Sequence, residues 1–400
     1  MTDSTKPDTL PVSALLALAM TGFICILTET LPAGLLPQIS AGLGVSPALA
    51  GQLVTLYALG SLLAAIPLTI ATQGWRRRNV LLLAIVGFLL FNSITAWSSN
   101  YVLTLAARFF AGMAAGLAWS LIAGYARRMV APHQQGRALA LAMVGTPIAL
   151  SLGVPIGTWL GGVVNWRTAF GLMSLLSIGL IAWVLAKVPD YPGQARTQRV
   201  PLRAVLLTPG VRPVLAVVLT WMLAHNMLYT YIAPFIAPAG LGSQVDRVLL
   251  AFGVAALIGI WITGRLVDRH LRQAVLTSLA TFALVALVFG LHAESAAVLY
   301  LGVFVWGLTF GGAATLLQTA LADAAGPGAD VAMSMNVVIW NSAIAAAGLI
   351  GGLLLGQFGA GVFPWAMLAL LLVALWIASA ASQHGFPSGQ RRSDVLVAGH

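Results

Sequence analysis

Charged side chains are scarce in this chain, and their scarcity limits what it can be. Asp, Glu, Lys and Arg together account for 8% of its 400 residues, whereas a soluble domain carries about 25%. Hydrophobic residues account for 60%, which is more apolar surface than a soluble fold keeps away from water. The composition therefore argues against a water-soluble enzyme or binding domain and predicts a protein embedded in a lipid bilayer.

Several chemical signatures are also missing. The single cysteine, Cys25, excludes an internal disulfide, and its place inside an apolar block favours a packing role. The sequence contains no cluster of metal-ligating residues, no phosphate-cradling glycine loop and no nucleotide-binding domain. We therefore expect no metal, no cofactor and no ATP hydrolysis. A membrane enzyme or a sensor would need a nucleophile with its base, or a soluble signalling domain, and the sequence contains neither.

Long apolar blocks recur along the whole chain. Each is roughly twenty residues long, which is enough to cross a bilayer core of about 30 Å. We predict twelve membrane-spanning helices, at 12–36, 47–71, 79–98, 101–126, 137–163, 167–187, 212–238, 246–267, 273–292, 294–322, 330–357 and 360–382.

A polar stretch with several prolines and arginines separates the sixth block from the seventh. We interpret it as a linker between two similar six-helix halves. The predicted fold class is an all-α membrane protein with a tail at 1–11, a six-helix bundle at 12–187, a linker at 188–211, a second six-helix bundle at 212–382 and a tail at 383–400.

The basic residues predict the orientation in the membrane. The net charge of +10 does not indicate a nucleic-acid partner, because the basic residues lie in short loops between apolar blocks. Loops rich in lysine and arginine stay in the cytoplasm. When the N-terminus is placed there, most of the 20 basic residues fall in cytoplasmic segments. We therefore predict a multi-pass protein of the bacterial inner membrane with both termini in the cytoplasm.

Glycine spacing supports an internal repeat. Glycines four residues apart lie on one helix face and let neighbouring backbones approach closely. Such rows recur six spans apart, at Gly153, Gly157 and Gly161 in the fifth span and Gly348, Gly352 and Gly356 in the eleventh. Shorter pairs recur at Gly112 and Gly116 in the fourth span and at Gly307 and Gly311 in the tenth.

Glu29 is the only acidic side chain well inside a predicted span. A charge at the centre of a span costs about 2.5–3.5 kcal/mol on insertion scales. Such residues usually face the bundle interior or a water-filled cavity and mark a path for ions or protons. We therefore predict that Glu29 takes up and releases a proton that couples to transport through the membrane. The alternative is a neutral, hydrogen-bonded structural glutamate near a helix end.

Arg108 lies inside the fourth span, and its counterpart in the tenth span, aligned by the glycine pairs, is Val303. A charge present in one half only is not required by the repeat. Because arginine does not release its proton, we predict a fixed charge that acts on Glu29 or binds substrate. The alternative is a structural arginine paired with carbonyls of a broken helix.

Other polar and aromatic residues are candidates for the wall of a substrate cavity. His225 and Tyr229 are four residues apart on one face of the seventh span, although a lone intramembrane histidine is also typical of a helix core. Asn336 and Asn341 are about 140° apart around a helix, so we do not expect both to face the cavity. Three tryptophans are candidates to stack on a ring-shaped substrate, although core placement is the default: Trp119, Trp306 and Trp340.

Four stretches resemble signatures of the major facilitator superfamily, and the likeness covers essentially the whole chain. They are Thr28-Glu29 with Pro32 to Pro37 in the first span, Arg108 with Gly112 and Gly116 in the fourth, Gly153-Val154-Pro155-Ile156-Gly157 with Gly161 in the fifth, and Gly264-Arg265-Leu266-Val267-Asp268-Arg269 with Arg272 after the eighth. Within the superfamily, the chain most resembles twelve-span drug:proton antiporters of the arabinose and sugar efflux branch. The resemblance implies two pseudo-symmetric halves that rock around a central cavity.

The resemblance also implies roles for two stretches. Gly153, Pro155, Gly157 and Gly161 resemble the antiporter motif, although Val154 separates a glycine and a proline that are usually adjacent.

Gly264, Asp268, Arg269 and Arg272 resemble a cytoplasmic gating motif. In this motif Asp268 would meet arginines or helix N-termini in one access state only. The first-half copy is degenerate, because Thr72 stands where the acidic residue belongs. We therefore assign the gating role to the second copy, with an ordinary solvated loop as the alternative.

The expected function is export of a drug, sugar or nucleoside, driven by protons that return through Glu29. The expected partners are the substrate, protons and the lipid bilayer, and we expect a monomer. The alternative is an importer or facilitator of a small nutrient with the same fold. The fifth-span pattern favours export, because it resembles the motif of antiporters.

Overall fold

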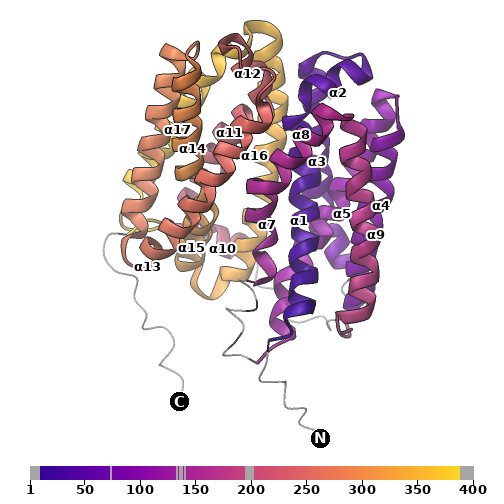
Figure 1. Cartoon of the computed structure of the whole chain (residues 1–400). Coiled ribbons are helices and arrows are strands. Elements are labelled where there is room, and N and C mark those ends of the chain that lie inside the picture. The colour runs from indigo at the N-terminus through magenta and orange to yellow at the C-terminus, as the bar shows by residue number, and fades with distance from the viewer. Residues whose placement is uncertain are drawn as a thin grey trace, which may run out of the picture. The chain divides into compact units, whose positions relative to one another are not determined.

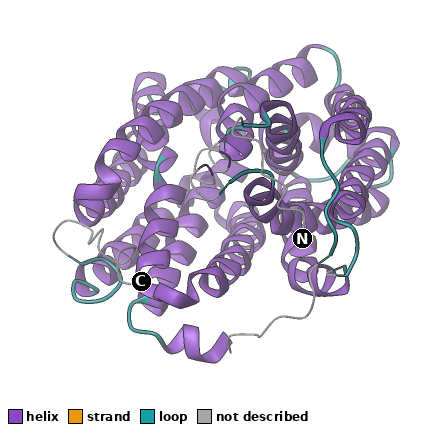
Figure 2. Cartoon of the chain, turned by 90° about the horizontal axis from the view of Figure 1, so that it is seen from below, coloured by secondary structure: helices purple, strands orange, loops and turns teal. Residues whose placement is uncertain are grey.

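The computed structural model describes residues 10–72, 74–131, 134, 138, 141–193 and 202–387. All regular structure in these residues is helical (Figure 2). They contain 12 helical segments long and apolar enough to span a membrane: Val12–Gly34, Pro47–Ala65, Arg77–Trp97, Tyr101–Arg128, Leu141–Val163, Trp166–Lys187, Val211–Thr230, Val245–Val267, Arg269–His292, Ala296–Ala325, Val331–Phe358 and Ala360–Ala380. Each lies within a few residues of a predicted span, so the twelve-span prediction is confirmed.

Helices of the first half cover residues up to 187. They are α1 (Val12–Gly34), α2 (Leu36–Leu43), α3 (Pro47–Ala71), α4 (Arg77–Trp97), α5 (Tyr101–Arg128), α7 (Gly145–Ile148), the π-helical turn η2 (Ala149–Gly153), α8 (Val154–Val163) and α9 (Trp166–Lys187). Local sequence sets several of their starts. The side chain of Asn100 accepts a hydrogen bond from the N–H of Leu103 and so caps α5, and Asn165 caps α9 in the same way.

Helices of the second half follow residue 201. They are α10 (Leu202–Leu207), α11 (Val211–Thr230), α12 (Ile232–Ile236), η3 (Ala237–Ala239), α13 (Val245–His292), α14 (Ala296–Gly311), α15 (Ala313–Ala325), η4 (Gly326–Gly328), α16 (Ala329–Phe358), η5 (Ala360–Val362) and α17 (Phe363–Ala380). The long α13 holds two spans, because the backbone leaves helical geometry at His270.

The chain divides into two compact units. Unit 1 comprises Met1–Gln198, Tyr229–Leu250 and Ile344–Ala360, and unit 2 comprises Arg199–Leu228, Ala251–Ala343 and Gly361–His400. Unit 1 therefore contains parts of the seventh, eighth and eleventh spans beside the first six. The division into two bundles at the linker stays a prediction.

Close backbone packing organises unit 1. Helix α5 packs against α3 and α4, and α4 packs against α9 (Figure 1). Glycine makes the approach of α3 and α5 possible: a Cβ atom at Gly112 would collide with the carbonyl oxygen of Tyr57, and one at Gly116 would lie 2.5 Å from that of Ser61. Side chains such as Phe88 and Leu121 fill the core around them.

Unit 2 repeats this packing. A Cβ atom at Gly307 of α14 would collide with the carbonyl oxygen of Phe252 of α13, and one at Gly311 with that of Ala256. The sequence separation between glycine and carbonyl is the same in both halves. The glycine pairs found in the sequence therefore mark equivalent helix contacts.

Large apolar side chains also cover the outer surface. Trp97 is 90% exposed, Trp376 69% and Leu301 67%. A surface of this kind is unfavourable in water and suits contact with lipid tails.

Candidate functional site

Glu29 lies in α1 beside polar groups from three other helices. Its side chain is partly buried and has no hydrogen bond to any described residue. Its carboxyl group lies within electrostatic range of Arg108 of α5, Tyr57 of α3 and Tyr229 of α11, although no direct Glu29–Arg108 ion pair forms between these described side chains. The structure thus brings together Glu29, Arg108 and Tyr229, which the sequence patterns indicate separately, and adds Tyr57.

Arg108 is fully buried. Its Nη2 donates a hydrogen bond to the carbonyl of Thr28 at 2.6 Å, and its Nε donates to the carbonyl of Leu53 at 3.3 Å. The guanidinium carbon lies 4.7 Å from the ring centre of Tyr57 and 5.7 Å from that of Phe170, within the range of cation–π attraction. The charge is therefore held in place by backbone carbonyls and aromatic rings.

Pro32 explains why the Thr28 carbonyl is available to Arg108. Pro32 lies inside α1, and proline has no N–H to donate to the carbonyl four residues earlier. That carbonyl belongs to Thr28, and Arg108 supplies the replacement donor. A proline four residues after Thr28 therefore indicates that the Thr28 carbonyl is free to accept a hydrogen bond from another helix.

The side chain of Thr28 connects this centre to two further helices. Asn92 of α4 donates from Nδ2 to the Thr28 hydroxyl at 3.1 Å, and the hydroxyl donates to the sulfur of Met173 of α9 at 3.5 Å. Thr28 and Asn92 are both fully buried. No sequence motif indicates Asn92, because it contacts the site from a span that carries no other site residue.

Tyr229 and His225 share α11 but contact different groups. Tyr229 is buried, and its hydroxyl lies close to Thr30 and Glu29 of α1. His225 accepts a hydrogen bond at Nδ1 from the Trp306 indole at 3.1 Å and stacks on Phe310 with ring centres 3.4 Å apart. Tyr229 belongs to unit 1 and His225 to unit 2, and their role as one wall of a substrate cavity stays a prediction.

The remaining predicted cavity residues differ in their surroundings. Asn336 of α16 is buried, and its side-chain oxygen has no hydrogen-bond partner among the described residues. Asn341 is buried and donates to a carbonyl one turn earlier in its own helix at 2.9 Å. Trp340 and Trp119 are partly buried, and Trp119 lies against α1. Their contact with a substrate stays a prediction.

The glycines of the predicted antiporter motif face the helix that carries Glu29. Pro155 is the second residue of α8, which follows the π-helical turn η2 directly, and both elements lie within the fifth span. The glycines lie along α1 and its C-terminal cap: Gly153 lies against Phe23, Gly157 against Leu31 and Gly161 against Leu35. A small-residue face therefore lets the fifth span approach α1 closely.

A hydrogen-bonded cluster within unit 1 joins the second, seventh and eleventh spans. The hydroxyl of Tyr231 donates to the carbonyl of Gly348 at 2.6 Å, and Gln52 of α3 donates to the same carbonyl at 3.1 Å. The glycine face of α16 leaves room for these side chains, because a Cβ atom at Gly352 would lie 2.8 Å from both. The row of glycines in the eleventh span indicated a close helix contact from the sequence alone. Gln52 belongs to no motif, so the sequence did not indicate its part in this contact.

Comparison with known families decides the class of protein. The family model for the Major Facilitator Superfamily matches residues 18–344. The chain belongs to the major facilitator superfamily. It is therefore a multi-pass membrane transporter and not an enzyme, and the predicted major facilitator fold is confirmed.

Similar proteins include named efflux pumps. The purine ribonucleoside efflux pump NepI of Shigella sonnei is 29% identical over 354 residues, covering 87% of this chain and 88% of the pump. NepI of Escherichia coli strain K12 is 29% identical over 353 residues, with the same coverage of 87% and 88%.

Two solved structures share the fold. The human organic anion transporter MFSD10 superposes with a TM-score of 0.69 and 18% identity, covering 93% of this chain and 100% of that chain. A bacterial homologue of the human lysosomal transporter Spinster, in an inward-facing and unoccupied conformation, has a TM-score of 0.70 and 12% identity, covering 95% and 98%. At these identities the likeness shows the fold alone.

The predicted gating motif lies around the break in α13 at His270. Gly264 and Arg269 are exposed, and the side chain of Asp268 lies outside the described part of the structure. Arg272 donates hydrogen bonds to the carbonyls of Ala378, Ser379 and Phe386 at 2.8–3.0 Å. A cation at a helix C-terminus is favourable, so Arg272 anchors the end of α17. The gating role of the motif stays a prediction.

The loop between α3 and α4, which holds the degenerate first-half copy of the motif, binds an acidic residue that follows the sixth span. Arg76 forms an ion pair with Asp190, which follows α9. The backbone N–H of Arg78 donates to the Asp190 carboxylate at 3.2 Å, and that of Arg77 donates to the carbonyl of Tyr191 at 2.9 Å. Burial alone would raise the pKa of the Asp190 carboxyl, but its contacts with Arg76 and Arg78 outweigh this effect and place the pKa below its usual value.

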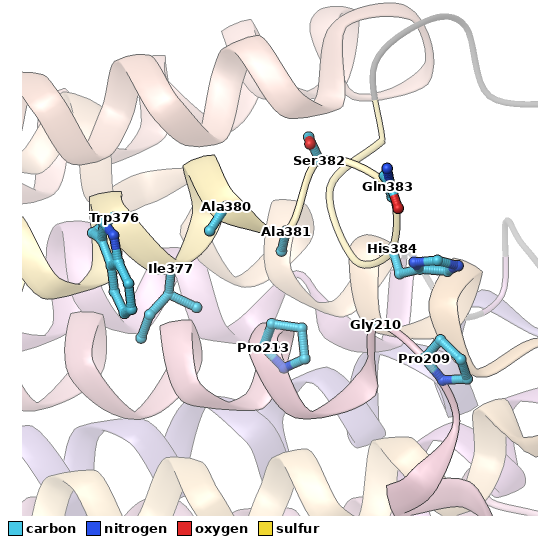
Figure 3. A pocket seen from close by; sticks show the side chains of 10 residues that line it. All are labelled: Pro209, Gly210, Pro213, Trp376, Ile377, Ala380, Ala381, Ser382, Gln383 and His384. Carbon is cyan, nitrogen blue, oxygen red and sulfur yellow. The ribbon is translucent and has the colours of Figure 1, made fainter.

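A surface pocket of about 650 Å³ lies in unit 2 (Figure 3). Its wall is formed by the end of α17 with the segment that follows, including Trp376 and His384, and by the start of α11, including Pro213. It contains none of the residues predicted to bind substrate or protons. We therefore do not place the transport site there.

Proposed function

We propose that this transporter exports a small organic molecule in exchange for protons, and that Glu29 takes up and releases the proton. The observation that carries this proposal is the setting of the Glu29 carboxylate. It is partly buried in a membrane span without a hydrogen bond to the described protein. A purely structural buried glutamate would be expected to have such partners, whereas a proton carrier has to remain accessible to water or substrate.

Arg108 makes the ionisation of Glu29 sensitive to the site's occupancy. Its charge is fixed by the carbonyls of Thr28 and Leu53 and is retained at every physiological pH. An ionised Glu29 is attracted to this cation, and a neutral Glu29 is not. Substrate and proton therefore compete for one region, and the two occupied forms favour different conformations.

The substrate class that we propose is purine ribonucleosides, as named for the efflux pumps that are 29% identical. We keep drugs and sugars as the other classes to screen. The proton gradient supplies the driving force without a cofactor. We further propose a monomer in the bacterial inner membrane with both termini in the cytoplasm, in line with the distribution of basic residues.

Transport by reconstituted protein tests the proposal. Proteoliposomes with an imposed pH gradient would be assayed with a tritiated purine ribonucleoside, and proton movement would be followed in parallel. Protons and substrate should move in opposite directions, and movement in the same direction would identify an importer. Glu29→Gln keeps the size of the side chain but removes its titration, and should abolish uphill transport.

Glu294 provides a matched control. It is the only other glutamate, and it is exposed outside the spans. Glu294→Gln should transport as the unaltered protein does. Unaltered proton coupling in Glu29→Gln would refute the assignment of the proton to this residue.

A further inference from the structure

Thr28 takes part in two sets of contacts, one through its backbone and one through its side chain. Its carbonyl accepts from Arg108 at 2.6 Å, while its hydroxyl accepts from Asn92 at 3.1 Å. All three residues are 0% exposed. The position of Thr28 therefore links α4 to the cation beside Glu29.

The turn of α1 around Glu29 has a weakened helical ladder. Pro32 removes the N–H that would otherwise hold the Thr28 carbonyl. Such a turn depends on contacts from neighbouring helices for its position. Asn92 provides one such contact from α4, and the sulfur of Met173 in α9 provides a second.

We propose that Asn92 is a positioning residue for proton coupling: by holding Thr28, it sets the separation between the Arg108 guanidinium and the Glu29 carboxylate. This inference rests on the proposed role of Glu29 as the proton carrier. The groups that act electrostatically with Glu29 are Arg108 of α5, Tyr57 of α3, Tyr229 of α11 and Cys25 of its own helix. Asn92 is uncharged, so it acts on Glu29 only through geometry.

Loss of the Asn92 side chain has a defined consequence. In Asn92→Ala the Thr28 hydroxyl loses its donor, and the turn that holds Arg108 loosens. The cation then stabilises the ionised carboxylate less. The titration midpoint of Glu29 should therefore move to higher pH than in the unaltered protein, by about 0.5–1 unit.

The sequence makes this midpoint measurable without a substrate. The chain has only two glutamates, Glu29 and Glu294. Protein labelled with ¹³C at the glutamate carboxyl carbon should give two signals by NMR. Glu29→Gln assigns the membrane signal, and the exposed Glu294 serves as an internal reference.

Ser93 offers a matched control in the next position of α4. Its hydroxyl bonds to that of Ser174 of α9 at 2.9 Å, so Ser93→Ala removes one interhelical hydrogen bond without touching Thr28. We expect Ser93→Ala to leave the Glu29 midpoint unchanged. An equal shift in both variants would show general loosening of the bundle and overturn the proposal.

Thr28→Val tests the path of the effect, because it removes the hydroxyl and keeps the carbonyl that binds Arg108. It should shift the midpoint as Asn92→Ala does, and the double variant should shift it no further. Additive shifts, or an unchanged midpoint in folded Asn92→Ala, would contradict the positioning role. Failure of the proposed function is a separate result, since it would appear as unaltered coupling in Glu29→Gln whatever the midpoint does.

Discussion

Two centres occupy corresponding places in the two halves of the chain, and the first is charged while the second is aromatic. In the first half, Arg108 lies over the ring of Tyr57. By their spacing from the glycine pairs, the corresponding second-half residues are Val303 and Phe252. Phe252 packs against Trp306 with ring centres 4.6 Å apart.

The glycine contacts beneath these centres are equivalent. Gly112 meets the backbone at Tyr57, and Gly307 meets it at Phe252. The second half makes this contact with Val303 at the position that corresponds to Arg108. The close packing of the two helices therefore does not require a buried cation. The glycines therefore belong to the architecture that both halves share, whereas the buried cation occurs in the first half only.

The largest expected effect comes from removing the charge. Arg108→Gln keeps hydrogen-bond donors but loses the cation that acts on Glu29, and should abolish proton-coupled uphill transport in proteoliposomes. Val303→Leu, a packing change at the corresponding position, should leave coupling intact. Coupled transport by folded Arg108→Gln would remove the functional distinction between the two centres.

The close helix packing should be equally sensitive in both halves. Gly112→Ala and Gly307→Ala each place a methyl group against a backbone carbonyl, and overpacking of this kind costs about 1–3 kcal/mol. Thermal unfolding in detergent measures the effect. Gly124→Ala in α5 is the control, because its Cβ would meet no atom within 4 Å. Destabilisation confined to one half would contradict the equivalence of the two contacts.

A smaller effect is expected at the aromatic centre. His225→Phe keeps an aromatic ring beside Phe310 but removes the acceptor of the Trp306 indole. The loss should reduce stability by about 1–2 kcal/mol and leave proton coupling unchanged. Loss of coupling at full stability would instead make His225 a second proton carrier.

The smallest effect concerns the loops that anchor the sixth and twelfth spans. The first-half loop binds Asp190, whereas Arg272 in the second half binds backbone carbonyls. Asp190→Asn should cost less than about 1 kcal/mol, because Arg76 is solvent-exposed.

The pH dependence of this contact follows from the lowered pKa of Asp190. The contribution of this contact to the free energy of unfolding is fully present above the unfolded-state pKa of Asp, about 3.9. It is lost as the pH falls through the lower folded-state pKa of Asp190. The stability difference between the unaltered protein and Asp190→Asn should therefore disappear in acid. A difference that persists at low pH would point to packing rather than charge.

The spans, the glycine contacts and the presence of Glu29 and Arg108 inside membrane spans were predictable from the sequence. Apolar length is a local property that the bilayer thickness imposes on each span. A glycine row needs only helical periodicity to define its face. Charged residues in a span stand out in the sequence because burying each one is energetically costly. Pro32 leaves the Thr28 carbonyl without its helical donor, and Arg108 binds that carbonyl.

The partners of these residues depend on packing between spans. Asn92 and Thr28 are 64 residues apart, and Arg76 and Asp190 are 114 apart. Such contacts depend on the rotation and register of packed helices, and neither quantity is encoded in a local pattern. For the same reason the shared face of His225 and Tyr229 did not predict their different partners. A spacing of four residues shows that two side chains leave the same side of a helix, whereas the packing of neighbouring spans determines which groups each side chain contacts.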